Sequence, residues 1–279
     1  MADPTLRLHD RAPDVARAQE FLNRAGAILD PDGDFGGGTA RAVREFRLAN
    51  GLPDNGLIDA PMWDLLRALS EPSPDIPTKT VAFIAREEVG GRDYYDSSCA
   101  RPAWPGGDSG VTIGVGYDLG YQTAFEDDWS DQLPAADIAR LKKWVGVTGA
   151  AAQAGPAALK DIVIPWAASW DGYIRRTLPQ EIGKTRTAFV PGPTAPPLPP
   201  LCLGVLVSVV YNRGTAMTDN SADDRRREMR TIRDAVASGD YRRIPQALLD
   251  MRRLWPPGNG LIGRREREAA LFQEGLAVG

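Results

Sequence analysis

The sequence predicts a mainly helical protein in two parts, a small three-helix domain followed by a larger helical domain with one short β-rich patch. Three observations predict this fold class. Apolar residues recur at three- and four-residue spacing in most segments, which is typical of amphipathic helices. The proline-rich stretch 70–79 cannot continue a helix and indicates a linker. The glycine-rich stretch 109–120 alternates apolar and small residues, as a short hairpin does. We therefore expect domains at residues 1–69 and 80–279.

Most of the chain after the linker has helical periodicity. Residues 201–210 are apolar on every side, which predicts a central helix enclosed by others. The proline-rich segment 190–200 is expected to be extended. Helices are expected at residues 80–88, 135–146, 156–177, 201–213, 222–238, 241–254 and 263–275.

The composition suits a soluble globular protein and argues against several classes of function. Hydrophobic residues make up 43% of the 279 residues, and the net charge of −4 argues against nucleic acid as a partner. Residues 222–268 hold 12 arginines against 8 acidic residues, which fits either a surface for an anionic polymer or solvated helix faces with paired charges. The single histidine, His9, makes a Ser-His-Asp triad or a His-rich zinc site hard to build. We therefore expect no metal ion or cofactor.

Cysteine content and terminal sequence bear on the compartment. Cys99 and Cys202 are too few for a disulfide framework, and the sequence does not say whether they pair. Residues 1–10 lack the basic start and apolar run of a secretory signal peptide, and the longest apolar stretch is too short to span a bilayer. We expect synthesis in the cytoplasm without a signal peptide, no membrane insertion, and a monomer because coiled-coil heptads are absent from the sequence.

Two turn-rich segments separate three helical patterns in the first domain. Phe35, Val43, Phe46 and Trp63 are expected to form its core. The pieces follow the order Gln19-x-x-Leu22, Asp32-Gly-Asp-Phe35-Gly36, Thr39-x-x-Ala42-Val43-x-x-Phe46, Asn50-Gly-Leu52 and Asp54-Asn-Gly56. This order resembles the peptidoglycan-binding domain found at the ends of many cell-wall hydrolases. The resemblance covers nearly all of residues 1–69 and implies that bacterial peptidoglycan is a partner.

Glu88 ends an apolar stripe in the first helix after the linker. Val81, Ile84, Ala85 and Glu88 fall at i, i+3, i+4 and i+7, and therefore on one face. A glutamate in this position is expected to be partly desolvated, and desolvation raises a carboxyl pKa. A raised pKa is what a general acid for glycoside cleavage requires. On the helix alone, an ordinary solvated or ion-paired carboxylate is the alternative.

Thr112 and Asp118 lie in a glycine-rich stretch, with glycines at positions 110, 114, 116 and 120. The stretch 109–120 has the sequence SGVTIGVGYDLG, and such glycines let backbone approach backbone or substrate closely. On these residues alone, the stretch is a tight hairpin in which Asp118 satisfies a turn.

Several motifs of the second domain together resemble the phage-type lysozymes, in particular their pesticin-like branch. They are Glu88, Tyr94-Tyr95, the stretch from Ser109 to Gly120, Leu206-Val-Ser208-x-x-Tyr211-Asn212-x-Gly214 and Gly260-Leu-Ile-x-Arg264-Arg265-x-x-Glu268. These motifs follow one another in the same order as in that family, and together they cover most of residues 80–275. The resemblance implies a lysozyme-like α+β domain with a small β lobe. It implies hydrolysis of the β-1,4 bond between N-acetylmuramic acid and N-acetylglucosamine, with Glu88 as general acid and with Asp118 and Thr112 activating water.

Two neighbouring carboxylates are alternatives for these roles. Glu87, with Asp96, fits the acid-to-aspartate spacing of simpler phage lysozymes. Those enzymes place the threonine shortly after the aspartate, whereas Thr112 lies sixteen residues beyond Asp96. The order Glu, Thr, Asp favours Asp118, and the apolar stripe favours Glu88.

Tyr94, Trp104, Tyr117 and Asn212 are the expected substrate-binding residues. Trp104 lies in a loop, where its ring either covers a sugar face or packs internally. Asn212 either supports the cleft, as the resemblance implies, or only caps its helix. Two pairs are expected to be structural: Arg264 with Glu268 as a helix salt bridge, and Trp166 with Trp170 on one packed helix face.

The resulting hypothesis is an endolysin-type, bacteriolytic muramidase that acts on the cell wall after release. The alternatives are a secreted antibacterial toxin or effector with the same activity, a lytic transglycosylase that forms an anhydro product, and a non-catalytic wall-binding protein. The water-holding pair Thr112 and Asp118 favours hydrolysis over transglycosylation.

Overall fold

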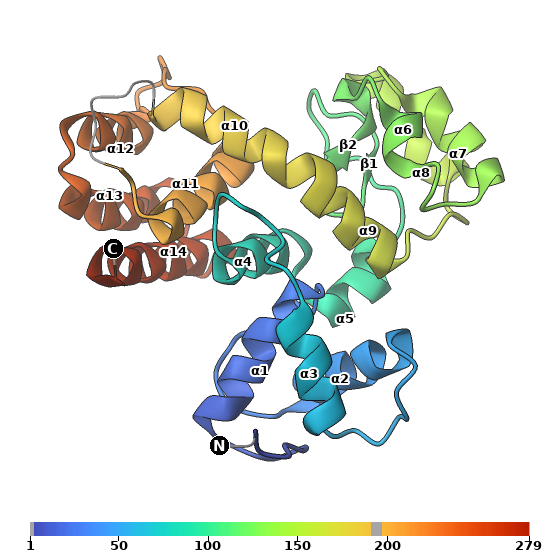
Figure 1. Ribbon diagram of the computed structural model, residues 1–279. Helices are drawn as coiled ribbons and strands as arrows, with labels where there is room; N and C mark the ends of the chain where they lie inside the picture. The colour runs from blue at the N-terminus through green and yellow to red at the C-terminus, as the bar shows by residue number, and fades with distance from the viewer. Residues whose placement is uncertain (1–2, 191–196, 279) are drawn as a thin grey trace. The chain divides into compact units, whose positions relative to one another are not determined.

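A computed structural model describes residues 3–190 and 197–278 (Figure 1). The chain is mainly helical with one small two-stranded sheet in the described part, which confirms the predicted fold class. Its contacts divide it into two compact units, each described by itself below. The first unit holds the residues up to Pro72 together with Ala85–Leu178, and the second holds Ser73–Ile84 together with the residues from Pro179 onward.

Three helices form the N-terminal domain, as predicted: α1 (Pro13–Arg24), α2 (Gly37–Ala49) and α3 (Ala60–Ala68) (Figure 1). The Asp59 carboxylate begins α3 by accepting a hydrogen bond from the Met62 amide at 3.3 Å, which satisfies one free donor of the first turn. The core prediction is confirmed, because Phe35, Val43, Phe46 and Trp63 are all buried.

Two buried polar side chains fix the connections between these helices. The Gln19 amide donates to Asp32 and to Thr39, each at 3.0 Å, and its oxygen accepts from the Gly33 amide at 3.0 Å. Arg47 is 1% exposed and donates to the Leu57 carbonyl and the Asp59 carboxylate. A buried polar group must be hydrogen-bonded to be tolerated, so these contacts hold the two turns in one conformation.

The rest of the first unit has its own core, formed by residues from Val111 to Ala168. A hairpin and short helices surround this core. The elements are α5 (Arg92–Tyr94), a π-helical turn (Tyr95–Cys99), β1 (Thr112–Ile113), β2 (Tyr117–Asp118), α6 (Phe125–Trp129), α7 (Ala135–Leu141), α8 (Gly155–Ala158), α9 (Trp166–Gly172), a second π-helical turn (Tyr173–Thr177), and 3₁₀ turns at Leu119–Tyr121, Lys142–Trp144 and Gly149–Ala152.

The single helix predicted over 156–177 is wrong. Helix α8 ends at Ala158, and α9 begins only at Trp166, directly after Pro165. Between them, residues 159–161 form a turn and residues 162–165 have no helical structure. The Ile164 amide donates to the Ala100 carbonyl at 2.7 Å, and the Ile164 carbonyl accepts from the Tyr95 hydroxyl at 2.8 Å. Tertiary hydrogen bonds and a proline thus override the local helical pattern.

All regular secondary structure in the described part of the second unit is helical. It contains the first part of α4 (Thr78–Val89), then α10 (Leu178–Phe189, from Pro179), α11 (Pro200–Arg213), α12 (Arg227–Ser238), α13 (Ile244–Asp250) and α14 (Gly260–Val278), with 3₁₀ turns at Tyr241–Arg243 and Met251–Leu254. Every residue from Leu201 to Val210 is buried, which confirms the predicted central helix. Of the segment expected to be extended, residues 191–196 lie outside the described residues.

Two expected helices of this unit are shorter than predicted. The helix expected from residue 222 begins at Arg227, because the preceding residues form turns in which Asp219 accepts from the Ser221 and Arg225 amides. The segment expected as one helix over 241–254 divides into a 3₁₀ turn, α13 and another 3₁₀ turn. Pro245 lies in the first turn of α13, where a missing amide donor is tolerated.

A buried ionic cluster joins α11 to α14. Glu268 is 0% exposed and forms ion pairs with Arg264 at 3.2 Å and with Arg265 at 3.0 Å. The Ser208 hydroxyl donates to the same carboxylate at 2.6 Å. The predicted Arg264–Glu268 salt bridge is confirmed. It is buried, whereas the spacing alone implied a surface pair, and breaking a buried pair costs more free energy of unfolding than breaking a surface pair.

Candidate functional site

The glycine-rich stretch folds into a hairpin that places Thr112 and Asp118 opposite each other. Strands β1 and β2 are antiparallel, with Thr112 paired to Asp118 and Ile113 paired to Tyr117. Ile113 and Tyr117 are buried in the core, whereas Thr112 and Asp118 are half-buried. Because side chains alternate between the two faces of a strand, Thr112 and Asp118 share the face that points away from the core.

Backbone amides fix the Asp118 carboxylate. The Gly110 amide donates to Oδ1 at 3.0 Å and to Oδ2 at 3.1 Å, and the Gly120 amide donates to Oδ1 at 2.9 Å. This is the turn-satisfying role that the residues alone predicted. It also orients the carboxylate.

The glycines of this stretch allow close backbone approach, as predicted. A Cβ at Gly110 would lie 2.5 Å from Asp118 Oδ1 and 2.5 Å from the Gly120 nitrogen, which no side chain could tolerate without displacement. Gly114 and Gly116 close the hairpin with φ of 57° and 72°, in the left-handed region that glycine adopts without strain.

Glu88 lies in the last turn of α4, in the same compact unit as the hairpin. Val81, Ile84 and Ala85 on its stripe are each 0% exposed. Glu88 is half-buried, and its Oε1 atom is inaccessible to solvent. The expectation of a partly desolvated carboxylate at the end of an apolar stripe is therefore met by the packing of α4.

The competing carboxylates have different surroundings. Asp96 forms ion pairs with Arg41 of the N-terminal domain and, at 4.0 Å, with Arg92. It is thus part of an ionic cluster, whereas Asp118 faces Thr112 across the hairpin. This difference favours Asp118 over Asp96. Glu87 is half-buried like Glu88, so burial does not separate those two.

The four expected substrate-binding residues lie in different environments. Tyr94 is 56% exposed beside Gly90, and Trp104 is half-buried, with its indole donating to the Ser109 carbonyl at 3.0 Å. Tyr117 is 2% exposed. Asn212 belongs to the second unit, where its oxygen accepts from Arg265 at 3.3 Å.

The packing of Tyr117 favours a core role over the substrate contact expected from the sequence. Its hydroxyl donates to the buried Asp128 at 2.6 Å, and its ring packs edge-on against Trp129 with centroids 5.3 Å apart. Burial and the hydrogen bond to Asp128 raise the pKa of Tyr117. The hairpin therefore uses Tyr117 to anchor the strand that carries Asp118.

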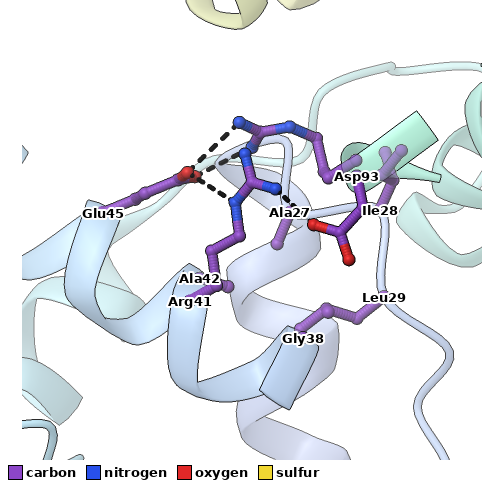
Figure 2. Close-up of a pocket in the computed structure, with 9 residues that line it drawn as sticks. Ala27, Ile28, Leu29, Gly38, Arg41, Ala42, Glu45 and Asp93 are labelled. Atoms are coloured by element: carbon purple, nitrogen blue, oxygen red, sulfur yellow. Dashed lines mark hydrogen bonds and ion pairs between the residues drawn. The ribbon is translucent and has the colours of Figure 1, made fainter. Parts of the chain in front are cut away.

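A second polar site, in the first unit, joins α2 to α5 (Figure 2). Glu45 accepts from Arg41 at 2.9 Å and from Arg92 at 2.8 Å, and Arg41 also pairs with Asp93 at 2.6 Å. Burial alone would lower the pKa of Arg41, but its hydrogen bonds to Asp96 and Glu45 outweigh burial and raise that pKa. These side chains line a pocket of about 100 Å³ whose other walls are Ala27, Ile28, Leu29, Gly38 and Ala42.

Sequence reasoning missed this second site because its partners lie far apart in the chain. Arg41 and Asp96 are 55 residues apart, and Arg92 and Glu45 are 47 residues apart. No spacing rule connects such pairs. The sequence did predict that Trp166 and Trp170 share a packed helix face close to this site, since Arg92 lies over the Trp166 ring. That pair is confirmed, with ring centroids 6.1 Å apart.

Comparison with known families identifies the N-terminal domain. Residues 11–66 match the family model described as a putative peptidoglycan binding domain. The matched segment covers all three N-terminal helices nearly completely, and it supports bacterial peptidoglycan as a partner. No curated protein sequence matches the chain closely enough to count as a relative.

The described residues contain no group of three or more histidine, cysteine, aspartate or glutamate side chains arranged to hold a metal ion. No helix in the described ranges is long and apolar enough to cross a membrane. Cys99 and Cys202 are both free thiols.

Proposed function

We propose that this protein is a peptidoglycan hydrolase, a muramidase whose N-terminal domain holds it on the bacterial cell wall. The observation that carries the proposal is the pairing of Thr112 with Asp118 on the outward face of a hairpin, in the same compact unit as the partly buried Glu88. Glycoside hydrolysis needs two carboxyl groups, and the Thr112 hydroxyl beside Asp118 is placed to help hold a water.

Each residue has a defined task in this proposal. Glu88 protonates the glycosidic oxygen between N-acetylmuramic acid and N-acetylglucosamine as the bond breaks. Asp118, oriented by the amides of Gly110 and Gly120, accepts a proton from a water that Thr112 helps to position. The water oxygen then bonds to the anomeric carbon on the face opposite the leaving group, which is the inverting arrangement.

Digestion of purified peptidoglycan tests this function. The wild type is expected to release fragments with reducing N-acetylmuramic acid ends, identified by mass spectrometry. Glu88→Gln is expected to lose about 10²–10⁴-fold in rate, the usual contribution of a general acid. Glu87→Gln is the matched control, because it is the same change at the neighbouring half-buried position.

The other outcomes select the remaining hypotheses. Loss of activity in Glu87→Gln and not in Glu88→Gln would move the acid to Glu87. Anhydro ends would identify a lytic transglycosylase. Binding to sacculi without any fragments would leave a wall-binding protein. An endolysin and a secreted antibacterial effector would share the products, and a neighbouring gene for a membrane pore or for an immunity protein would separate them.

A further inference from the structure

A large pocket adjoins the polar site of Figure 2 in the first unit. Its volume is about 670 Å³, within the range of roughly 300–1,000 Å³ that holds drug-sized ligands. Ala27, Ala42, Glu45 and Arg92 line both this pocket and the smaller one, so the two are direct neighbours. One wall comes from α1, α2 and the loop between them, and the other comes from Arg92 and from α9.

Tertiary contacts fix both walls in place. The Trp166 indole donates to the Gly26 carbonyl at 2.8 Å. A Cβ at Gly26 would lie 2.8 Å from the Trp170 ring, so only glycine allows this loop to lie against α9. Arg92 stacks on Trp166, with its guanidinium carbon 4.8 Å from the ring centroid. The pocket is therefore largely preformed, which reduces the entropy that a ligand must lose on binding.

The chemistry of the pocket combines small apolar walls with charges of both signs. Five alanines line it, together with Leu22, Phe46 and the two tryptophans. Glu45, Arg92 and Asp171 supply the charges, and Arg41 and Asp93 continue them into the smaller pocket. The Glu45 side chain is 44% exposed and that of Asp93 is 95% exposed. The carboxylate of each pair is therefore accessible to a ligand, while Arg92 and Arg41 are held more deeply, at 14% and 30% exposed.

These features fit a peptide better than a sugar. A sugar ring typically stacks on the open face of an aromatic side chain. In this pocket, Arg92 covers a face of Trp166, and the Gly26 loop packs against Trp170. The hydroxyl and acetamido groups of the peptidoglycan glycan are uncharged. They would leave the pocket's charged side chains of both signs without ionic partners. The stem peptide carries alanine methyl groups, carboxylates and the second amino group of a diamino acid.

We propose that this pocket binds the peptidoglycan stem peptide, with its methyl groups against the alanines and its carboxylates and amine at Arg92 and Glu45. This inference rests on the wall-directed function proposed above and adds the part of the wall that is recognised. Because one wall belongs to the peptidoglycan-binding domain and the other to α5 and α9, the site is composite. The N-terminal domain alone does not complete it.

Isothermal titration of the full-length chain tests the proposal. The probes are the tetrapeptide L-Ala-γ-D-Glu-X-D-Ala, with diaminopimelate or lysine as X, and a chito-oligosaccharide as the uncharged glycan. Ala49→Trp fills the pocket from α2 and Ala167→Trp fills it from α9, and both positions are exposed and line the pocket. Leu48→Trp and Val163→Trp are matched controls, because these positions are 60% and 48% exposed and do not line it.

The wild type and both controls are expected to bind one of the tetrapeptides, and each filling variant is expected to weaken its binding at least about tenfold. Binding of the oligosaccharide alone, or peptide binding that neither filling variant weakens, would overturn the inference. A loss confined to Ala49→Trp would place the site on the N-terminal domain and refute its composite nature. Titration does not require cleavage, so a chain that fails to hydrolyse peptidoglycan in the digestion assay can still confirm or refute this site.

Discussion

Glu268→Gln is expected to destabilise the second unit strongly. In the native protein the Glu268 carboxylate accepts from Ser208 and neutralises Arg264 and Arg265, and none of the three charged residues is more than 3% exposed. The amide of glutamine removes the negative charge and turns a donor toward two guanidinium groups. Breaking a buried pair by removing one partner costs about 3–5 kcal/mol, because the remaining charge is buried without compensation.

Glu266→Gln is the matched control on the same helix. Glu266 pairs with Arg252 at 2.9 Å, but their side chains are 50% and 44% exposed, so its loss is expected to cost about 0–1 kcal/mol. Hydrogen exchange of the α11 and α14 amides, followed by mass spectrometry, measures the free energy of opening in this region. If Glu268→Gln lowered that free energy no more than Glu266→Gln does, the assignment of Glu268 as the charge that stabilises this cluster would be refuted.

Three further predictions follow from the packing and the polar contacts. Gly204→Ala would bring a methyl group within 2.3 Å of the Thr80 hydroxyl and is expected to cost about 1–3 kcal/mol in urea unfolding, whereas Gly183→Ala, in open space on α10, is expected to stabilise by about 0.4–1 kcal/mol. Burial would raise the pKa of Asp59, but the hydrogen bonds from Arg47, Asn55 and the Met62 amide, with the charge of Arg47, together outweigh burial and lower it. The stabilisation is therefore present above the unfolded pKa of about 3.9 and is lost on acidification below it. Asp59→Asn should flatten acid unfolding monitored by circular dichroism. Gly110→Ala is expected to displace the Asp118 carboxylate and to reduce sacculus digestion about a hundredfold while sacculus binding is retained; full digestion would argue against Asp118 as the base.

Local patterns predicted the elements whose residues act on near neighbours. The N-terminal helices, the central helix over 201–210 and the hairpin were all visible as periodicity or glycine spacing. The pairing of Thr112 with Asp118 follows from the hairpin, because a short turn fixes the register of its strands. The single helix predicted over 156–177 was wrong because distant residues decide the structure there: Ile164 takes its hydrogen-bond partners from residues 95–100.

Burial and long-range pairing were decided by the tertiary structure. Tyr117 and Thr112 lie on the same hairpin, but only the packing of Trp129 and Asp128 places Tyr117 in the core. The pocket beside Arg92 also depends on contacts across dozens of residues, such as Trp166 with Gly26.

The sequence by itself determined the mainly helical fold class, the three-helix peptidoglycan-binding domain and the candidate residues Glu88, Thr112 and Asp118. Their signals are local, because helix faces, turn glycines and motif spacing depend on residues a few positions apart. The tertiary structure alone decided which carboxylate is held by backbone amides, which arginines are buried, and where two walls meet to enclose a pocket. These properties depend on which distant segments pack together, and packing is set by the shape and charge of the whole unit rather than by any local pattern.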